Sequence, residues 1–251
     1  MAADNARDLG VQILDVEAAI RADAPLEELL PLAAIQQRAY SRLHSNPDWM
    51  TEIYDIVGPD LAPIVDLHME AKGELVELTP STNTELPAWD IIAPASIDDL
   101  LAFYSEAEEA TGTPWEYLAA INLIESRMGR IRGLSSADAA GPMQFIPETW
   151  DRYGDGDVFD PHDSIVAAGR LLADFGAPDD MAEALWHYNP TDRYVNAVTA
   201  YARILELEPR TFRAFWGWQV YYATTEGAIL LPVGYSQDQP IDVREYLDAN
   251  Q

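Results

Sequence analysis

The sequence predicts a mainly α-helical protein, and three observations support this fold class. Apolar residues recur at helical spacing in several segments, and two strong helix-start signals are present, Thr113-Pro114-Trp115-Glu116 and Asp160-Pro161-His162-Asp163. The chain has 251 residues, of which 48% are hydrophobic, so it can bury one large core or a core with appendages.

Residues 1–78 are predicted to form an N-terminal helical segment. Its first apolar residues approximate a helical period: Val11, Leu14, Val16, Ala19 and Ile20. Further helices are expected over 33–43 and 61–70, with breaks at Asn46-Pro47 and Gly58-Pro59.

Residues 79–96 are predicted to be a Pro/Thr-rich linker. Pro80, Pro87 and Pro94 occur here among Ser, Thr and Asn residues and interrupt helix formation. We therefore expect a domain boundary in this linker, or an extended segment that is fixed to the rest of the protein.

Residues 97–208 carry the clearest helix signals. Ser96 is the expected N-cap of a helix over 97–110. Thr113, which is followed by a proline and has a glutamate three positions later, is expected to cap a helix that runs to about Met128. Three further helices are expected: 161–175 behind an Asp160 N-cap, a short one from 179 or 180 to 188, and one from about 193 to 207.

Residues 209–251 are predicted to be a C-terminal extension of different character. The segments 218–224 and 228–233 are rich in β-branched and aromatic residues, and Glu226-Gly227 lies between them. This pattern predicts a β-hairpin.

The chain is strongly acidic, with 15 Lys and Arg residues against 43 Asp and Glu residues and a net charge of −28. Nucleic-acid binding is disfavoured, because no basic surface is available to replace phosphate counterions. We interpret the acidity as a solubility property of a salty or acid-tolerant setting, and a functional acidic patch is the alternative. Cysteine is absent, which excludes disulfides.

No segment is expected to cross a membrane, because no run approaches the roughly 18 apolar residues that a transmembrane helix needs. Residues 1–10 are polar and lack the apolar region of a signal peptide. We expect either a cytoplasmic protein or a mature form from which a signal peptide has been removed.

Glu125 is the strongest candidate for a catalytic group. On a helix it shares an apolar stripe with Tyr117, Ile121 and Met128. Desolvation raises the pKa of a carboxyl and keeps its proton available, which a general acid in glycoside cleavage requires. The alternative is a structural ion pair with one of three nearby arginines, Arg127, Arg130 or Arg132.

Two further motifs follow Glu125. The run Gly141-Pro142-Met143-Gln144-Phe145 begins with a glycine that permits close backbone approach, and Gln144 offers a donor and an acceptor to amide-bearing sugars. Tyr188-Asn189 lies at the end of a predicted helix, and the alternative to a functional role is that both are ordinary helix-end residues.

Together these motifs resemble the catalytic domain of lytic transglycosylases, the SLT or lysozyme-like family. The resemblance rests on Glu125, on Ser135-x-x-Asp138-Ala139-x-Gly141-Pro142-Met143-Gln144 and on Tyr188-Asn189, in this order, and it covers about residues 97–207. Asp138 stands where the family usually has glycine, and Pro142 where it usually has leucine. The proline form followed by Phe145 looks like the actinobacterial subset similar to membrane-bound lytic transglycosylase B.

The resemblance implies a lysozyme-like helical fold for 97–208 and an extracytoplasmic enzyme that acts on peptidoglycan glycan strands. It implies cleavage of the β-1,4 bond between N-acetylmuramic acid and N-acetylglucosamine with formation of a 1,6-anhydro ring, and Glu125 as the single general acid and base. It assigns substrate-binding roles to six residues: Ser135, Met143, Gln144, Phe145, Tyr188 and Asn189. No cofactor is implied, and no protein partner is predicted.

Two rival functions remain at this point. A hydrolytic muramidase would use Asp138 or another acidic residue to activate water, and a non-catalytic peptidoglycan-binding protein would keep only the fold. Products with reducing ends would identify the first, and the second would be insensitive to loss of the Glu125 carboxyl.

The loop 153–160 contains aspartates spaced by two, a pattern that suits calcium. Aligned with an EF-hand loop that starts at Asp151, however, the twelfth position is His162, and the bidentate carboxylate is missing. A loop that caps the helix after Asp160 is the preferred interpretation, and no metal site is predicted.

Overall fold

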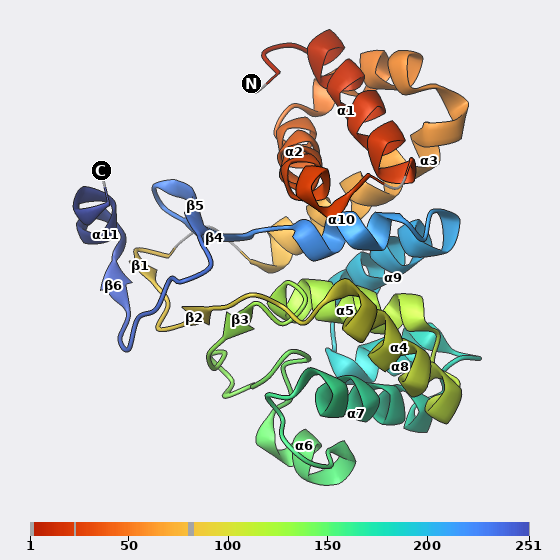
Figure 1. Ribbon diagram of the computed structural model, residues 1–251, viewed down its shortest axis with the longest axis vertical. Coiled ribbons are helices and arrows are strands. Elements are labelled where there is room, and N and C mark those ends of the chain that lie inside the picture. Colours follow the sequence, from red (N-terminus) through yellow and green to blue (C-terminus); the bar gives the residue numbers. More distant parts are fainter. Residues whose placement is uncertain (1–2, 23, 80–82, 251) are drawn as a thin grey trace. The chain divides into compact units, whose positions relative to one another are not determined.

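The protein is mainly helical, as predicted, and its short strands form small antiparallel pairs (Figure 1). The computed structural model describes residues 3–22, 24–79 and 83–250; Pro80, Ser81 and Thr82 of the predicted linker lie outside the described residues. The chain forms two compact units, Met1–Leu78 with Thr191–Trp218, and Thr79–Pro190 with Gln219–Gln251. Within the described part of the chain, no helix combines the length and apolarity needed to cross a membrane.

The first unit is built from helices of two regions of the chain, one before residue 79 and one after residue 190. Its elements are α1 (Ala6–Arg21), α2 (Leu26–His44), the 3₁₀ helix η1 (Pro47–Trp49), α3 (Met50–Leu78), α9 (Asp192–Leu207) and α10 (Thr211–Gly217). Helix α3 packs against both α1 and α9, so segments far apart in sequence share one core. The predicted breaks are confirmed, since α2 ends at His44, Asn46 is the N-cap of η1, and Gly58, with φ +71°, kinks α3.

A buried polar cluster lies in the core of the first unit. Glu17 is 1% exposed, and its Oε1 accepts hydrogen bonds from Gln36 Nε2 at 3.0 Å and Tyr40 Oη at 2.8 Å. His68 stacks on the Tyr40 ring with the centroids 3.7 Å apart. Burial raises the pKa of Glu17 and lowers the pKa of His68 to about 3, so the interior favours the neutral form of both groups.

The second unit combines a helical part with three short strand pairs. Its elements are β1 (Glu85–Leu86), β2 (Asp90–Ile91), α4 (Ile97–Thr111), α5 (Trp115–Ser126), β3 (Ile131–Arg132), α6 (Pro147–Tyr153), α7 (Pro161–Asp174), α8 (Met181–Tyr188), β4 (Val220–Thr224), β5 (Gly227–Leu231), β6 (Ile241–Asp242) and α11 (Val243–Ala249). The pairs are β1–β6, β2–β3 and β4–β5. The predicted hairpin is confirmed as β4–β5, with Thr224 opposite Gly227.

The predicted linker and the later part of the predicted C-terminal extension, from residue 219 onward, pack together in the second unit. One apolar cluster contains Leu86 and Ile91 from the linker together with Val220, Leu231, Tyr235 and Val243 from the extension. The backbone also joins them, because Val243 N–H donates to Thr84 O at 3.0 Å. The second unit therefore contains residues from three predicted segments, the linker, the 97–208 domain and the C-terminal extension. Apolar burial joins these segments although they lie far apart in sequence.

Two predicted N-caps are confirmed, and one is wrong. Ser96 and Asp160 each accept a backbone N–H in the first turn of α4 and α7, and Asp180 does the same in α8, whose start is predicted at 179 or 180. Thr113 does not cap α5: Pro114 takes the N-cap position, and Thr113 Oγ1 donates to Gly169 O at 3.2 Å. Helix α5 also ends at Ser126 rather than Met128, because Arg127 adopts a left-handed conformation with φ +54°.

The Glu17→Gln variant is expected to become more stable relative to the wild type as the pH rises. Because the pKa of folded Glu17 is raised, its contribution to stability is present below the ordinary value of 4.5 and is lost as the pH rises through the raised value. Glutamine keeps an acceptor for Tyr40 and Gln36 but cannot ionise. Melting temperatures measured between about pH 4 and pH 8 test this.

Glu206→Gln is the matched control, because Glu206 is exposed on α9 of the same unit. It should show no such trend. A large loss of melting temperature for Glu17→Gln at every pH would contradict the prediction. It would indicate an ionised Glu17 paired with a protonated His68, whose Nε2 lies 4.0 Å from Glu17 Oε1.

Candidate active site

Glu125 lies in the last turn of α5 and is half-buried. Its neighbours on that helix, Ile121 and Leu123, are fully buried and anchor the helix in the core. The pKa of Tyr188 is raised well above its ordinary value, first by burial and then by the nearby Glu125 carboxylate. The structure thus brings together two of the predicted site residues, Glu125 and Tyr188.

The backbone that follows Glu125 is strained. Arg127, Met128 and Gly129 have φ values of +54°, +62° and +82°. Left-handed backbone is unfavourable for residues other than glycine, and such strain tends to occur at functional sites. Hydrogen bonds hold this turn, because Met128 N–H donates to Asn122 O at 3.1 Å and Gly129 N–H donates to Ser126 Oγ at 2.9 Å.

The motif Gly141–Gln144 forms a tight turn, which we call the motif turn. Ala140 and Phe145 exchange two backbone hydrogen bonds of 2.9 Å across its base. Gly141 has φ +78°, and a Cβ at this position would lie 1.9 Å from Val158 O, so only glycine fits. Gln144 has φ +50°, and its Nε2 donates to Gly141 O at 3.0 Å, so the side chain helps to close the turn.

Side chains from two helices hold the motif turn. Pro142 O accepts from Asn122 Nδ2 at 2.9 Å and from Ser126 Oγ at 2.6 Å, and both donors lie on α5. Met143 O accepts from Tyr188 Oη at 2.6 Å, at the end of α8. The end of the Glu125 helix, the motif turn and Tyr188 therefore form one hydrogen-bonded assembly.

The remaining predicted site residues differ in exposure. Met143 and Phe145 are 0% and 3% exposed, so their side chains support the assembly from inside. The Phe145 ring packs against Trp150 and Tyr188 with centroids 5.5 and 6.1 Å away. Asn189 is half-buried, and its N–H donates to Leu185 O at 3.0 Å at the end of α8.

Ser135 organises the loop before the motif turn. Its Oγ accepts from Ala137 N–H and Ala139 N–H, each at 3.1 Å. Asp138 is exposed in this loop and has φ +57°. A left-handed conformation favours glycine and is tolerated by aspartate. Backbone geometry therefore accounts for an aspartate at the position where the resembling family has glycine.

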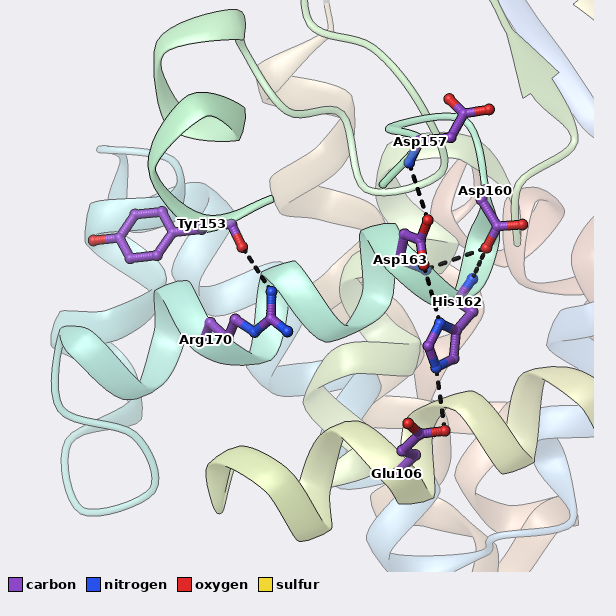
Figure 2. Close-up of polar contacts among 7 residues, drawn as sticks. All are labelled: Glu106, Tyr153, Asp157, Asp160, His162, Asp163 and Arg170. Atoms are coloured by element: carbon purple, nitrogen blue, oxygen red, sulfur yellow. Dashed lines mark hydrogen bonds and ion pairs between the residues drawn. The ribbon is translucent and has the colours of Figure 1, made fainter. Parts of the chain in front are cut away.

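The loop before α7 packs against the motif turn through Val158 and is held by a polar network (Figure 2). Asp160 Oδ1 accepts from His162 N–H at 2.9 Å, and Asp163 Oδ2 accepts from Asp157 N–H at 3.0 Å. The expected capping role of Asp160 is confirmed. Because these carboxylates serve as acceptors for backbone N–H groups and His162, we assign no metal to this loop.

His162 connects this network to α4. Its Nδ1 lies 3.1 Å from Asp163 Oδ1, and its Nε2 lies 3.1 Å from Glu106 Oε2 (Figure 2). The hydrogen bond with Asp163 and the Glu106 carboxylate raise the pKa of His162, and partial burial opposes them. A protonated His162 can donate to both carboxylates at once.

Asp138→Ala is expected to lower the free energy of unfolding by about 1 kcal/mol, whereas Asp138→Gly is expected to leave it unchanged or raise it. The reason is that only glycine adopts φ near +57° without a Cβ penalty. Denaturant unfolding measures both variants. Ala137→Gly, one residue away at an ordinary φ, is the control and should be destabilising. Equal destabilisation by Ala137→Gly and Asp138→Gly would contradict the conformational explanation.

His162→Gln is expected to lower the melting temperature more at about pH 5.5 than at about pH 9. The raised pKa of His162 means that its stabilising contribution is fully present below its ordinary value of 6.5 and is lost as the pH rises through the raised value. Glu106→Gln removes one of the two carboxylates that contact His162. It should therefore weaken only in part the pH dependence of the stabilisation that His162 provides. If His162→Gln lowers the melting temperature by the same amount at both pH values, the protonated ring has no stabilising role.

Comparison with known proteins finds similarity over part of the chain. Residues 103–207 match the family model described as the transglycosylase SLT domain. The chain is 35% identical over 80 residues to membrane-bound lytic murein transglycosylase F of Thiobacillus denitrificans, which covers 32% of this chain and 17% of that protein. It is 34% identical over 116 residues to the protein of the same name from Methylobacillus flagellatus, covering 43% of this chain and 24% of that protein.

The chain thus spans less than a quarter of the length of these curated relatives. No solved structure matches significantly. The matched segment contains Glu125, the motif turn and Tyr188, and it covers α5 to α9 together with most of α4. Residues 103–207 are therefore similar to the transglycosylase SLT domain, and the chain has distant similarity to membrane-bound lytic murein transglycosylase F.

Proposed function

We propose that the protein is a peptidoglycan lytic transglycosylase with Glu125 as its single general acid and base. The observation that carries the proposal is the assembly in which the last turn of α5, the motif turn and Tyr188 are joined by hydrogen bonds through Pro142 O and Met143 O. The SLT domain over 103–207 supports the same reaction class. Because peptidoglycan lies outside the cytoplasmic membrane, we place the activity there.

One carboxyl is sufficient for this reaction. Hydrolysing glycosidases normally use two carboxylates, one of which activates water or attacks the sugar. In the proposed reaction, protonated Glu125 donates its proton to the glycosidic oxygen, and the acetamido carbonyl of N-acetylmuramic acid stabilises the developing oxocarbenium ion. The ionised Glu125 then accepts the proton of the C6 hydroxyl, whose oxygen closes the 1,6-anhydro ring. No water is added, and an intramolecular hydroxyl replaces a second reactant.

The other predicted site residues would act around Glu125. Tyr188, with its raised pKa, stays protonated and would orient groups next to the carboxyl while it holds Met143 O. Gln144, Ser135 and Asn189 would shape the sugar subsite, and the buried Met143 and Phe145 would support it from inside. Pro142 and Phe145 still favour the subset similar to transglycosylase B, which stays a prediction because the relatives found are of type F.

Hydrolysis assisted by Asp138 has less support. Asp138 is the departure from the motif that favours hydrolysis, and its left-handed φ of +57° gives it a conformational explanation instead. The products decide between the two reactions, since hydrolysis leaves reducing ends and transglycosylation leaves anhydro ends.

Glu125→Gln is expected to reduce product formation from purified peptidoglycan by at least about 100-fold, because it keeps the shape of the side chain and removes the proton. Released fragments are analysed by mass spectrometry, and those from the wild type should be one water lighter than hydrolytic fragments. Glu148→Gln, on the exposed surface of α6, is the control and should keep full activity. Melting temperatures confirm that all proteins are folded.

Each alternative result has a defined meaning. Reducing ends from the wild type would establish a muramidase, and Asp138→Gly would then test the water-activating role. Unchanged activity in Glu125→Gln would exclude Glu125 as the acid. Folded protein that binds glycan strands but releases no product would indicate a binding role.

A further inference from the structure

We propose that Asn122 is a positioning residue for this reaction, because its side-chain amide sets the placement of the motif turn relative to Glu125. The inference rests on the proposed function and adds a residue outside the motifs that the sequence identified. Asn122 lies on α5, three residues before Glu125, so both side chains project from the same part of the helix.

Asn122 is fully buried, and both ends of its amide are used. It is 0% exposed, its Oδ1 accepts from Tyr104 Oη at 2.6 Å, and its Nδ2 donates to Pro142 O at 2.9 Å. A second, longer contact of 3.3 Å joins Nδ2 to Ser126 Oγ. The amide therefore links α4, α5 and the motif turn in a single buried chain of hydrogen bonds.

The network permits only one orientation of the amide. Pro142 O is a carbonyl oxygen and can only accept, so the group that faces it must be the NH₂ group. Tyr104 Oη then donates to Oδ1, and the raised pKa of this buried phenol keeps its proton in place. A flipped amide would place two acceptors against each other at Pro142, so Pro142 O is the group that orients Asn122, and the Tyr104 hydroxyl completes the pairing.

This contact controls a distance that matters for catalysis. Glu125 and Ser126 lie on the last turn of α5, while Met143 and Gln144 belong to the motif turn. A shift of the motif turn away from α5 would move bound sugar relative to the Glu125 carboxyl, and a misplacement of about 1 Å can cost about 100-fold in rate. Ser126 also donates to Pro142 O, so loss of Asn122 alone should displace the turn without releasing it.

The test compares Asn122→Leu and Asn122→Asp with the wild type on soluble, uncross-linked glycan strands. Asn122→Leu removes the donor and should lower kcat by about 10- to 100-fold, with KM changed by less than about threefold. In Asn122→Asp the introduced carboxyl still accepts from Tyr104, and it can donate to Pro142 O only when protonated. Its kcat relative to the wild type should therefore rise as the pH falls, whereas the ratio for Asn122→Leu should stay constant.

Hydrogen exchange gives a readout that needs no activity. In Asn122→Leu the amides of residues 140–145 should exchange faster, and those of α7 should not change. Three results would each overturn the inference. They are a kcat of folded Asn122→Leu equal to that of the wild type, a ratio of the kcat of Asn122→Asp to that of the wild type that does not vary with pH, and unchanged exchange over 140–145 in Asn122→Leu.

Glu125→Gln separates this inference from the proposed function. If Glu125→Gln abolishes product and the Asn122 variants behave as the wild type, only the positioning role fails. If Glu125→Gln keeps activity, the proposed function fails. Faster exchange at residues 140–145 in Asn122→Leu would then show that Asn122 holds the motif turn, but its positioning role in this reaction would fail with the proposed function.

Discussion

The candidate site depends on a single carbonyl group, Pro142 O. It accepts two hydrogen bonds from α5, through Asn122 and Ser126, and these bonds fix the motif turn to the helix that carries Glu125. Buried polar groups are costly unless paired, so this fully paired arrangement favours one geometry over any alternative packing of the turn. Proline at this buried position contributes no N–H of its own, so the carbonyl that serves both donors is the one backbone polar group that it brings to the site.

Backbone strain is concentrated around the same assembly. Among the residues that the structure describes, the non-glycine residues with positive φ are Arg127, Met128, Asp138 and Gln144. All four lie between the end of the Glu125 helix and the end of the motif turn. Side-chain hydrogen bonds maintain these conformations, because the hydroxyls of Ser126 and Ser135 accept from backbone N–H groups and the Gln144 amide donates to Gly141 O. Strain held by surrounding structure in this way is typical of sites that must present groups in a fixed arrangement.

The electrostatics of the protein differ between surface and interior. The net charge of −28 is carried by a surface rich in carboxylates, whereas the interior groups Glu17, His68 and Tyr188 have pKa values shifted toward their neutral forms. Burial causes these shifts because a low-dielectric interior penalises charge. Glu125, by contrast, is half-buried at the end of α5 and lies close enough to Tyr188 to raise the pKa of that phenol.

The sequence by itself determined the helical class, the caps at Ser96 and Asp160, the kink at Gly58 and the β4–β5 hairpin, because caps, kinks and tight turns depend on a few neighbouring residues. Only the tertiary structure decided the end of α5, the short helices α6, α10 and α11, and the packing of residues 84–91 with the C-terminal strands. It also decided that Tyr188 and Asn122 donate hydrogen bonds to the motif turn, and no local sequence pattern predicts these two contacts. The physical reason is that these features follow from hydrogen bonds and apolar burial between segments far apart in sequence, whose free energy exceeds local propensity.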